Sequence, residues 1–215
     1  MGIILVGSLA KGYGDEHSDV DLEVVVTEDR YDQLKKSAQK IIHTEEYDLI
    51  FTTINRLQRV KESEMDEDHS WYKGCPVLLD KTEKLAGILK EISKYDVSSR
   101  LDRLKRYYLR YWEATLYSMG CLKHESILSA KIYAAIAMQE LIRLLFNFNF
   151  QWAPKLQWAF KELPLLQRKP TNLETKIESI LTKPDANEQS KLWNETAALL
   201  REEDYFWVDK PEEIM

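Results

Sequence analysis

The sequence predicts an α+β protein in which a mixed α/β domain is followed by an all-α helical bundle. Up to about residue 80, short runs rich in β-branched residues alternate with a helical pattern, as is typical of a mixed sheet covered by helices. From about residue 84, strand-like runs disappear and long helical patterns replace them. The 215 residues are enough for one large domain or two small ones. We therefore expect one domain over residues 1–83 and a second over residues 84–215.

The first domain is expected to contain four strands and one helix. Apolar or β-branched side chains cluster in the four predicted strands, at residues 3–6, 20–27, 47–54 and 77–79. A helix is predicted over residues 29–42, because apolar side chains recur near helical spacing from Tyr31 to Ile42.

The second domain is expected to consist of five helices with recognisable end signals. The predicted helices run from Ser98 to Gly120, from Glu125 to Phe148, onward from about Pro154, onward from a capping box at Thr171–Glu174, and onward from the cap residue Asp185. The second of these is apolar around much of its circumference, so we expect it to lie at the centre of the bundle.

Composition limits the partners and the location of the protein. The net charge of -6 argues against duplex nucleic acid, which is bound mainly through Lys and Arg. Cys75 and Cys121 are far apart in sequence, which argues against a cysteine zinc site or a disulfide framework and favours a reduced, cytoplasmic location. No apolar run reaches the length of a membrane span, and the N-terminal run is too short for a signal peptide, so no membrane partner is expected.

The stretch "SDVDLEVVV" places several carboxylates on one face of a predicted strand. Because side chains alternate along a strand, Asp19, Asp21 and Glu23 share a face. Carboxylates this close repel one another unless a cation joins them, and Mg²⁺ prefers oxygen ligands. Asp48 begins another apolar strand and joins Asp19 and Asp21 if the two strands pair. The alternative is a solvated strand edge that resists aggregation.

A Gly-Ser step precedes these carboxylates and suggests a phosphate site. Gly7 lets a phosphate approach the backbone, and Ser8 offers a hydroxyl beside exposed backbone N–H groups. Lys11 can add positive charge, although a solvated loop lysine is the alternative. Carboxylates that hold metal, facing a turn that holds phosphate, indicate phosphoryl or nucleotidyl transfer.

The segment "GSLAKGYGDEHSDVDLEVVV" resembles the signature of the polymerase-β-type nucleotidyltransferase superfamily, in which Gly-Ser is followed by Asp-x-Asp on a strand and a third Asp on a later strand. The resemblance covers roughly residues 1–80. It implies that Asp19 and Asp21 bind two divalent metal ions and that Asp48 is a third ligand or the base for the acceptor proton. It also implies that Gly7 and Ser8 hold the β- and γ-phosphates of a nucleoside triphosphate.

A nucleotidyltransferase domain followed by a helical bundle also resembles the adenylyltransferases that modify aminoglycoside or lincosamide antibiotics. This looser resemblance implies AMP transfer from ATP to a hydroxyl of a small molecule. In the helical half, Lys155 is a candidate for contact with the triphosphate, and Glu140 is an alternative base to Asp48 or a partner in a salt bridge within the bundle.

The sequence therefore predicts a Mg²⁺-dependent nucleotidyltransferase with Asp19, Asp21 and Asp48 as metal-binding catalytic residues. Two alternatives stay open, a nucleotidyltransferase that modifies a protein partner, as in toxin–antitoxin pairs, and a nucleotide-binding protein without catalysis. No pattern indicates the acceptor, the preferred base or the oligomeric state.

Overall fold

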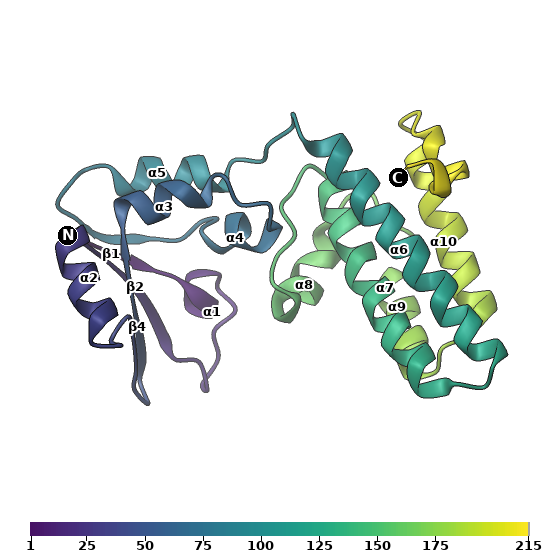
Figure 1. Cartoon of the computed structure of the whole chain (residues 1–215), viewed down its shortest axis with the longest axis horizontal. Coiled ribbons are helices and arrows are strands. Elements are labelled where there is room, and N and C mark those ends of the chain that lie inside the picture. Colours follow the sequence, from purple (N-terminus) through teal and green to yellow (C-terminus); the bar gives the residue numbers. More distant parts are fainter. Residues whose placement is uncertain (215) are drawn as a thin grey trace. The chain divides into compact units, whose positions relative to one another are not determined.

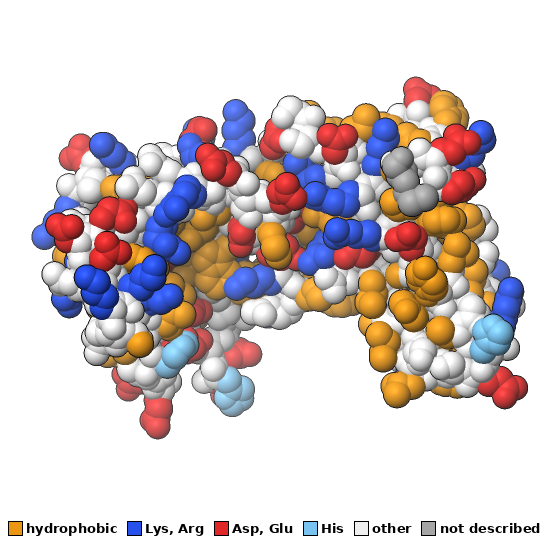
Figure 2. Space-filling view, viewed as in Figure 1, with side chains coloured by type: hydrophobic (Ala, Val, Ile, Leu, Met, Phe, Trp, Pro, Cys, Tyr) orange, Lys and Arg blue, Asp and Glu red, His pale blue; other side chains and the backbone are white. Residues whose placement is uncertain are grey.

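The computed structural model describes residues 1–214, which form two compact units (Figure 1). The sheet unit covers Met1–Lys94, and the helical unit begins at Tyr95. The predicted α+β architecture is confirmed, because a mixed sheet comes first and helices follow. Within residues 1–214, no helix is both long enough and apolar enough to cross a membrane. Acidic and basic side chains are interspersed over the face shown in Figure 2.

The sheet unit alternates strands with short helices. Its elements in chain order are β1 (Gly2–Leu5), α1 (Gly7–Ala10), β2 (Val20–Val26), α2 (Glu28–Lys36), β3 (Ile41–His43), β4 (Tyr47–Thr53), α3 (Ile54–Val60), α4 (Asp66–Trp71), β5 (Val77–Asp80) and α5 (Leu85–Ser93). All four predicted strands are present, and the short strand β3 adds a fifth.

The five strands form one sheet in the order β3-β4-β2-β1-β5. Strands β2 and β4 are parallel, and the other neighbouring pairs are antiparallel. A core cluster joins Ile4 of β1 and Val25 of β2 to Leu57 of α3 and Ile92 of α5, all of them buried. The parallel pair matters for the site, because it places the first residues of β2 and β4 side by side.

The predicted helix over residues 29–42 is wrong in its last part. Helix α2 ends at Lys36, and Ala38 adopts a left-handed conformation with φ of 57° that stops the helix. Ile41 and Ile42 continue the apolar spacing of the helix, but they pair with β4 as part of β3. The left-handed residue Ala38 therefore ends the helix although the apolar periodicity continues. No pattern in the sequence predicts this conformation.

Helix α5 sets where the sheet unit ends. Leu85, Ile88, Leu89 and Ile92 of this helix are buried in the core of the sheet unit. The unit therefore extends to Lys94, whereas the sequence placed the boundary after residue 83, before this helix.

The helical unit is built around two long helices. Its elements are α6 (Arg100–Lys123), α7 (Ile127–Phe148), α8 (Leu156–Glu162), η1 (Leu163–Leu165), α9 (Leu173–Thr182), α10 (Ala186–Arg201), η2 (Phe206–Asp209) and η3 (Pro211–Glu213). Its core joins α6, α7, α9 and α10, and α7 contributes the longest run of buried residues, as its apolar circumference predicted.

The predicted ends of the helices in this unit agree with the structure only in part. The side chain of Asp185 accepts hydrogen bonds from the N–H groups of Asn187 and Glu188, so the predicted cap of α10 is confirmed. The capping box is wrong, because α9 is preceded by Asn172 in a left-handed conformation without a side-chain cap. Helix α6 continues past Gly120 to Lys123.

Candidate active site

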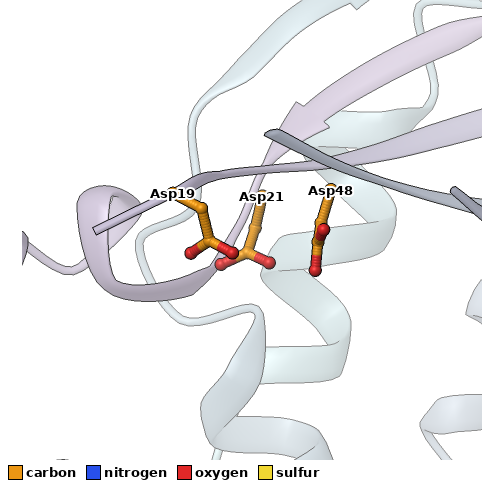
Figure 3. Close-up of side chains that lie close together, drawn as sticks. All are labelled: Asp19, Asp21 and Asp48. Atoms are coloured by element: carbon orange, nitrogen blue, oxygen red, sulfur yellow. The ribbon is translucent and has the colours of Figure 1, made fainter. Parts of the chain in front are cut away.

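Three aspartates meet at one end of the parallel strand pair. Asp19 directly precedes β2, Asp21 lies within β2, and Asp48 is its register partner on β4. One carboxylate oxygen of each residue lies within 4.8 Å of the others (Figure 3). Asp19 is exposed, and the other two are half-buried. Strand alternation predicts this convergence if the two strands pair, and the structure shows that pairing.

This arrangement fits a hard divalent cation. Ionised carboxylates only accept hydrogen bonds and repel one another, so a cation between them removes the repulsion and occupies their lone pairs. Mg²⁺ takes oxygen ligands and retains positions for water and substrate phosphate. Asp19, Asp21 and Asp48 are therefore the residues that could hold a metal ion in the sheet unit.

Gly7 lies directly against Asp21 and explains why glycine stands at this position. Its φ is +74°, and a Cβ atom built on Gly7 would lie 1.8 Å from Asp21 Oδ2. The preceding N–H, of Val6, donates a hydrogen bond to the backbone oxygen of Asp21 over 2.9 Å. The Gly7-Ser8 step, which begins the short helix α1, is therefore held beside the carboxylates. The predicted role of Gly7 and Ser8 in phosphate binding stays a prediction.

Lys11 is engaged with the end of helix α4. Its Nζ donates to the backbone oxygens of Ser70 over 2.6 Å and Lys73 over 2.7 Å. These contacts connect the loop of the motif to α4, a structural role that the sequence did not reveal. The predicted contact of Lys11 with phosphate stays a prediction.

His43 belongs to the site and was missed by the sequence analysis. It is the register partner of Asp48 on β3, and its Nδ1 lies 2.8 Å from Asp48 Oδ1. The imidazole is largely exposed, while the carboxylate of Asp48 is largely buried. The three residues of β3 show no alternation of buried and exposed side chains, and assigning residues 29–42 to a helix excluded the pairing of β3 with β4.

Glu23 follows Asp21 on the same face of β2 and is buried in the sheet unit. The hydroxyl of Tyr72 donates to Glu23 Oε1 over 3.1 Å, and Oε2 has no hydrogen-bond partner among residues 1–214. Burial raises the pKa of Glu23 to about 7, although hydrogen bonds from Tyr72 and Thr52 oppose the rise. The close spacing of these carboxylates predicts that a cation joins them. At Glu23, the raised pKa favours the neutral acid, which can be buried without a cation.

Two further sequence candidates lie in the helical unit. Lys155 precedes α8, and its Nζ lies 5.9 Å from the ring centre of Trp158. Glu140 is buried in α7, and its Oε1 pairs with Arg143 over 2.9 Å. The salt bridge anticipated for Glu140 is therefore present.

Comparison with known proteins agrees with the site geometry. Residues 1–71 match the family model of the nucleotidyltransferase domain. This part of the sheet unit is therefore similar to nucleotidyltransferase domains. The match covers the Gly-Ser step and all three aspartates.

A comparison with solved structures finds a further similar protein. The crystal structure of a nucleotidyltransferase-like protein from Exiguobacterium sibiricum 255-15 is similar, with a TM-score of 0.42 and 13% sequence identity. The similarity covers 94% of this chain and 72% of that one. A search of curated proteins finds no match.

Proposed function

We propose that this chain is a Mg²⁺-dependent adenylyltransferase that moves AMP from ATP to a hydroxyl group of a small molecule. The convergence of Asp19, Asp21 and Asp48 within 4.8 Å, in a nucleotidyltransferase domain, is the observation that supports this proposal. The choice of ATP and of a small acceptor rests on the resemblance to antibiotic adenylyltransferases. An aminoglycoside or lincosamide is accordingly the first acceptor to test.

The three aspartates have the role of metal ligands in this proposal. Two divalent ions bound there would stabilise negative charge on the attacking and leaving oxygens of an in-line displacement. The half-buried positions of Asp21 and Asp48 on paired strands hold these carboxylates in a fixed register. Fixed ligands contribute to catalysis because no reorganisation is needed at the moment of reaction.

The Gly-Ser step has the role of a phosphate site. Gly7 brings the chain close to Asp21, so a triphosphate held by Gly7 and Ser8 would have its reacting phosphate near the carboxylates. Lys11 and Lys155 are proposed to add positive charge to this triphosphate. Lys11 would do so while its ammonium is held by the carbonyl groups of Ser70 and Lys73.

The reaction exchanges one phosphorus–oxygen bond for another. The acceptor oxygen forms a bond to the α-phosphorus, the bond from that phosphorus to the bridging oxygen breaks, and its electron pair leaves with pyrophosphate. The acceptor proton passes to a base. Asp48 is favoured over Glu140 for this task, because Asp48 lies with Asp19 and Asp21, whereas the carboxylate of Glu140 is paired with Arg143. Asp48 then serves as the base or as the third metal ligand.

Pyrophosphate release tests the proposal. The full chain is incubated with Mg²⁺, each labelled nucleoside triphosphate and a panel of hydroxyl acceptors, aminoglycosides and lincosamides among them. We expect release with ATP and an acceptor, and loss of that release in Asp21→Asn and after chelation of divalent ions. Asp32→Asn is the matched control, since Asp32 is an exposed carboxylate on α2.

Each outcome separates one part of the proposal. Release with another nucleotide contradicts the adenylyl part alone. Labelling of a protein rather than of a small acceptor contradicts the small-molecule part. Tight nucleotide binding without release under every condition, in the wild type as in Asp21→Asn, contradicts an enzymatic function.

A further inference from the structure

Helix α7 has an apolar stripe that remains exposed on the helical unit. Leu128, Ile132 and Ile136 follow one another at helical spacing, and they are 74%, 55% and 43% exposed. Figure 2 shows hydrophobic side chains gathered over the lower part of this unit, where α7 runs. Leucine and isoleucine exposed in a row over about two turns are unusual, since isolated apolar side chains are the normal pattern on a protein surface.

A groove lies beside this stripe. It has a volume of about 440 Å³ and is bounded by α7, α8 and α9. Apolar side chains dominate its lining, among them Ile136, Leu156, Phe160 and Leu181. Leu128 does not line the groove and lies further toward the start of α7. The surface therefore combines a protruding apolar residue with an apolar hollow.

The stripe and the groove are poor in charge. Between Ile127 and Gln139, Lys131 is the only charged residue. The centre of a protein–protein interface differs from ordinary protein surface mainly in its low content of charged residues. The pattern therefore indicates a surface that another protein surface covers.

The exposed apolar area is large enough for a stable interface. Six apolar side chains of the stripe and the groove are between 38% and 74% exposed, namely Leu128, Ile132, Ile136, Leu156, Phe160 and Leu181. At roughly 150 Å² for a fully exposed side chain, they present on the order of 500 Å². A standard interface buries about 800 Å² on each partner, of which about 60% is apolar, so the two values agree.

We propose that this surface joins two copies of the chain in a symmetric dimer. Leu128 and Ile136 are separated by roughly 12 Å along α7, with Ile132 midway. A two-fold axis near Ile132 therefore places Leu128 of each copy in the groove of the other, and it brings the two Ile132 side chains together. A two-fold interface requires such a self-complementary surface, and two-fold dimers are the commonest protein assemblies.

Other partners fit this surface less well. A membrane surface attracts apolar stripes that are flanked by many Lys and Arg residues, and cytoplasmic leaflets repel negative charge. The chain carries a net charge of -6, and Lys131 is the only cation between Ile127 and Gln139. The same charges disfavour nucleic acid. A second copy needs no charge complementarity, because apolar area and shape carry the contact.

Sedimentation of the full chain tests the dimer. We expect twice the mass of one chain at micromolar concentration, and a dimer dissociation constant that rises at least about 30-fold in Ile132→Glu, the effect of losing a central interface residue. Leu165→Glu is the matched control, since Leu165 is 75% exposed and lies outside the surface. Both variants should keep the wild-type circular dichroism spectrum, because neither side chain is buried. Only Ile132→Glu should lower the melting temperature, because it alone removes the stabilisation that dimer formation gives. A monomeric wild type, or a dimer unaffected by Ile132→Glu, overturns the proposal.

Cross-linking tests the position of the axis. In a background with Cys75→Ser and Cys121→Ser, Ile132→Cys should oxidise rapidly to a disulfide-linked dimer, because a residue on a two-fold axis meets its own copy. Leu165→Cys should cross-link far more slowly. Equal cross-linking of both variants overturns the proposed axis. Flotation of a monomeric chain with vesicles of phosphatidylcholine and phosphatidylserine would overturn the choice of a second copy as the occupant.

Discussion

Gly7 shows at the scale of one residue how the backbone makes room for the carboxylates. Alanine at this position would have to accept a φ of +74° and would place its Cβ atom 1.8 Å from Asp21 Oδ2. We expect Gly7→Ala to reduce nucleotidyl transfer at least about 100-fold, the cost of displacing a reacting group by about 1 Å. Pyrophosphate release at saturating nucleotide measures the loss.

Gly12 provides the control for backbone strain. Its φ is +70°, but nothing lies within 4 Å of a Cβ atom built there. Gly7→Ala and Gly12→Ala should therefore share a strain cost on the order of 1 to 2 kcal/mol in the free energy of unfolding. Only Gly7→Ala should reduce transfer. Equal activity in the two variants would contradict the contact with Asp21.

Glu23 couples the stability of the metal-free protein to pH. Burial raises its pKa from 4.5 to about 7, so the native state keeps a proton that the unfolded state releases between these pH values. Stability from this group is therefore present below pH 4.5, falls as the pH rises, and is lost above about pH 7. The shift corresponds to on the order of 3 kcal/mol.

Glu23→Gln removes this ionisation and provides the test. The free energy of unfolding of the variant, relative to the wild type, should rise between pH 4.5 and 7 and level off above pH 7. Urea denaturation in the presence of a chelator measures the difference and keeps metal binding out of the comparison. A constant difference across this range would contradict the raised pKa.

These residues also show where sequence reasoning stops. Asp19, Asp21 and Asp48 could be brought together from the sequence, because strand alternation and one strand pairing place them on a common edge. The burial of Glu23 could not be predicted in this way, since its hydrogen-bond partner Tyr72 directly follows α4, far along the chain. Local periodicity predicts which face a side chain shares but not what covers that face.

At the scale of elements, β3 contributes to the site through its pairing with β4. His43 lies 2.8 Å from Asp48 Oδ1 and fixes that carboxylate oxygen. We expect His43→Ala to raise the Mg²⁺ concentration required for half-maximal transfer about 10-fold to 100-fold, as for other groups that orient metal ligands. Pyrophosphate release at varied Mg²⁺ concentration measures the effect.

The loop histidine His17 is the matched control for this prediction. Its side chain is exposed, and its Nε2 lies 3.6 Å from Glu16 Oε1. His17→Ala should leave the Mg²⁺ dependence unchanged, while His43→Gln, which restores an N–H donor, should recover part of the loss. A wild-type Mg²⁺ dependence in His43→Ala would show that Asp48 needs no support from β3.

The elements themselves were predictable where one physical signal dominated. The periodicity of apolar residues predicts long helices such as α7, and the run of β-branched residues in β2 predicts a strand. Strand β3 was not predicted, because Ile41 and Ile42 fit the helical spacing. The left-handed conformation of Ala38, which ends α2, has no recognisable signal in the sequence. Short elements depend on tertiary pairing and are therefore the least predictable from a sequence.

At the scale of the whole molecule, the two units have separate cores. Leu57 is fully buried in the core of the sheet unit, and Leu141 is fully buried in the core of the helical unit. Replacing either leucine with alanine leaves a cavity that costs about 2 to 5 kcal/mol. Because the two core clusters share no residue, we expect each cost to fall on the unit that contains the substitution.

Hydrogen exchange resolves this expectation along the chain. Leu57→Ala should reduce amide protection in β1, β2 and α5 and leave α6 and α7 near their wild-type protection, and Leu141→Ala should do the reverse. Leu57→Ala should also weaken nucleotide binding, because the strand pair that carries the three aspartates belongs to the destabilised unit. If either substitution lowers protection uniformly over both units, the chain unfolds as one cooperative structure and the separation of the cores has no energetic counterpart.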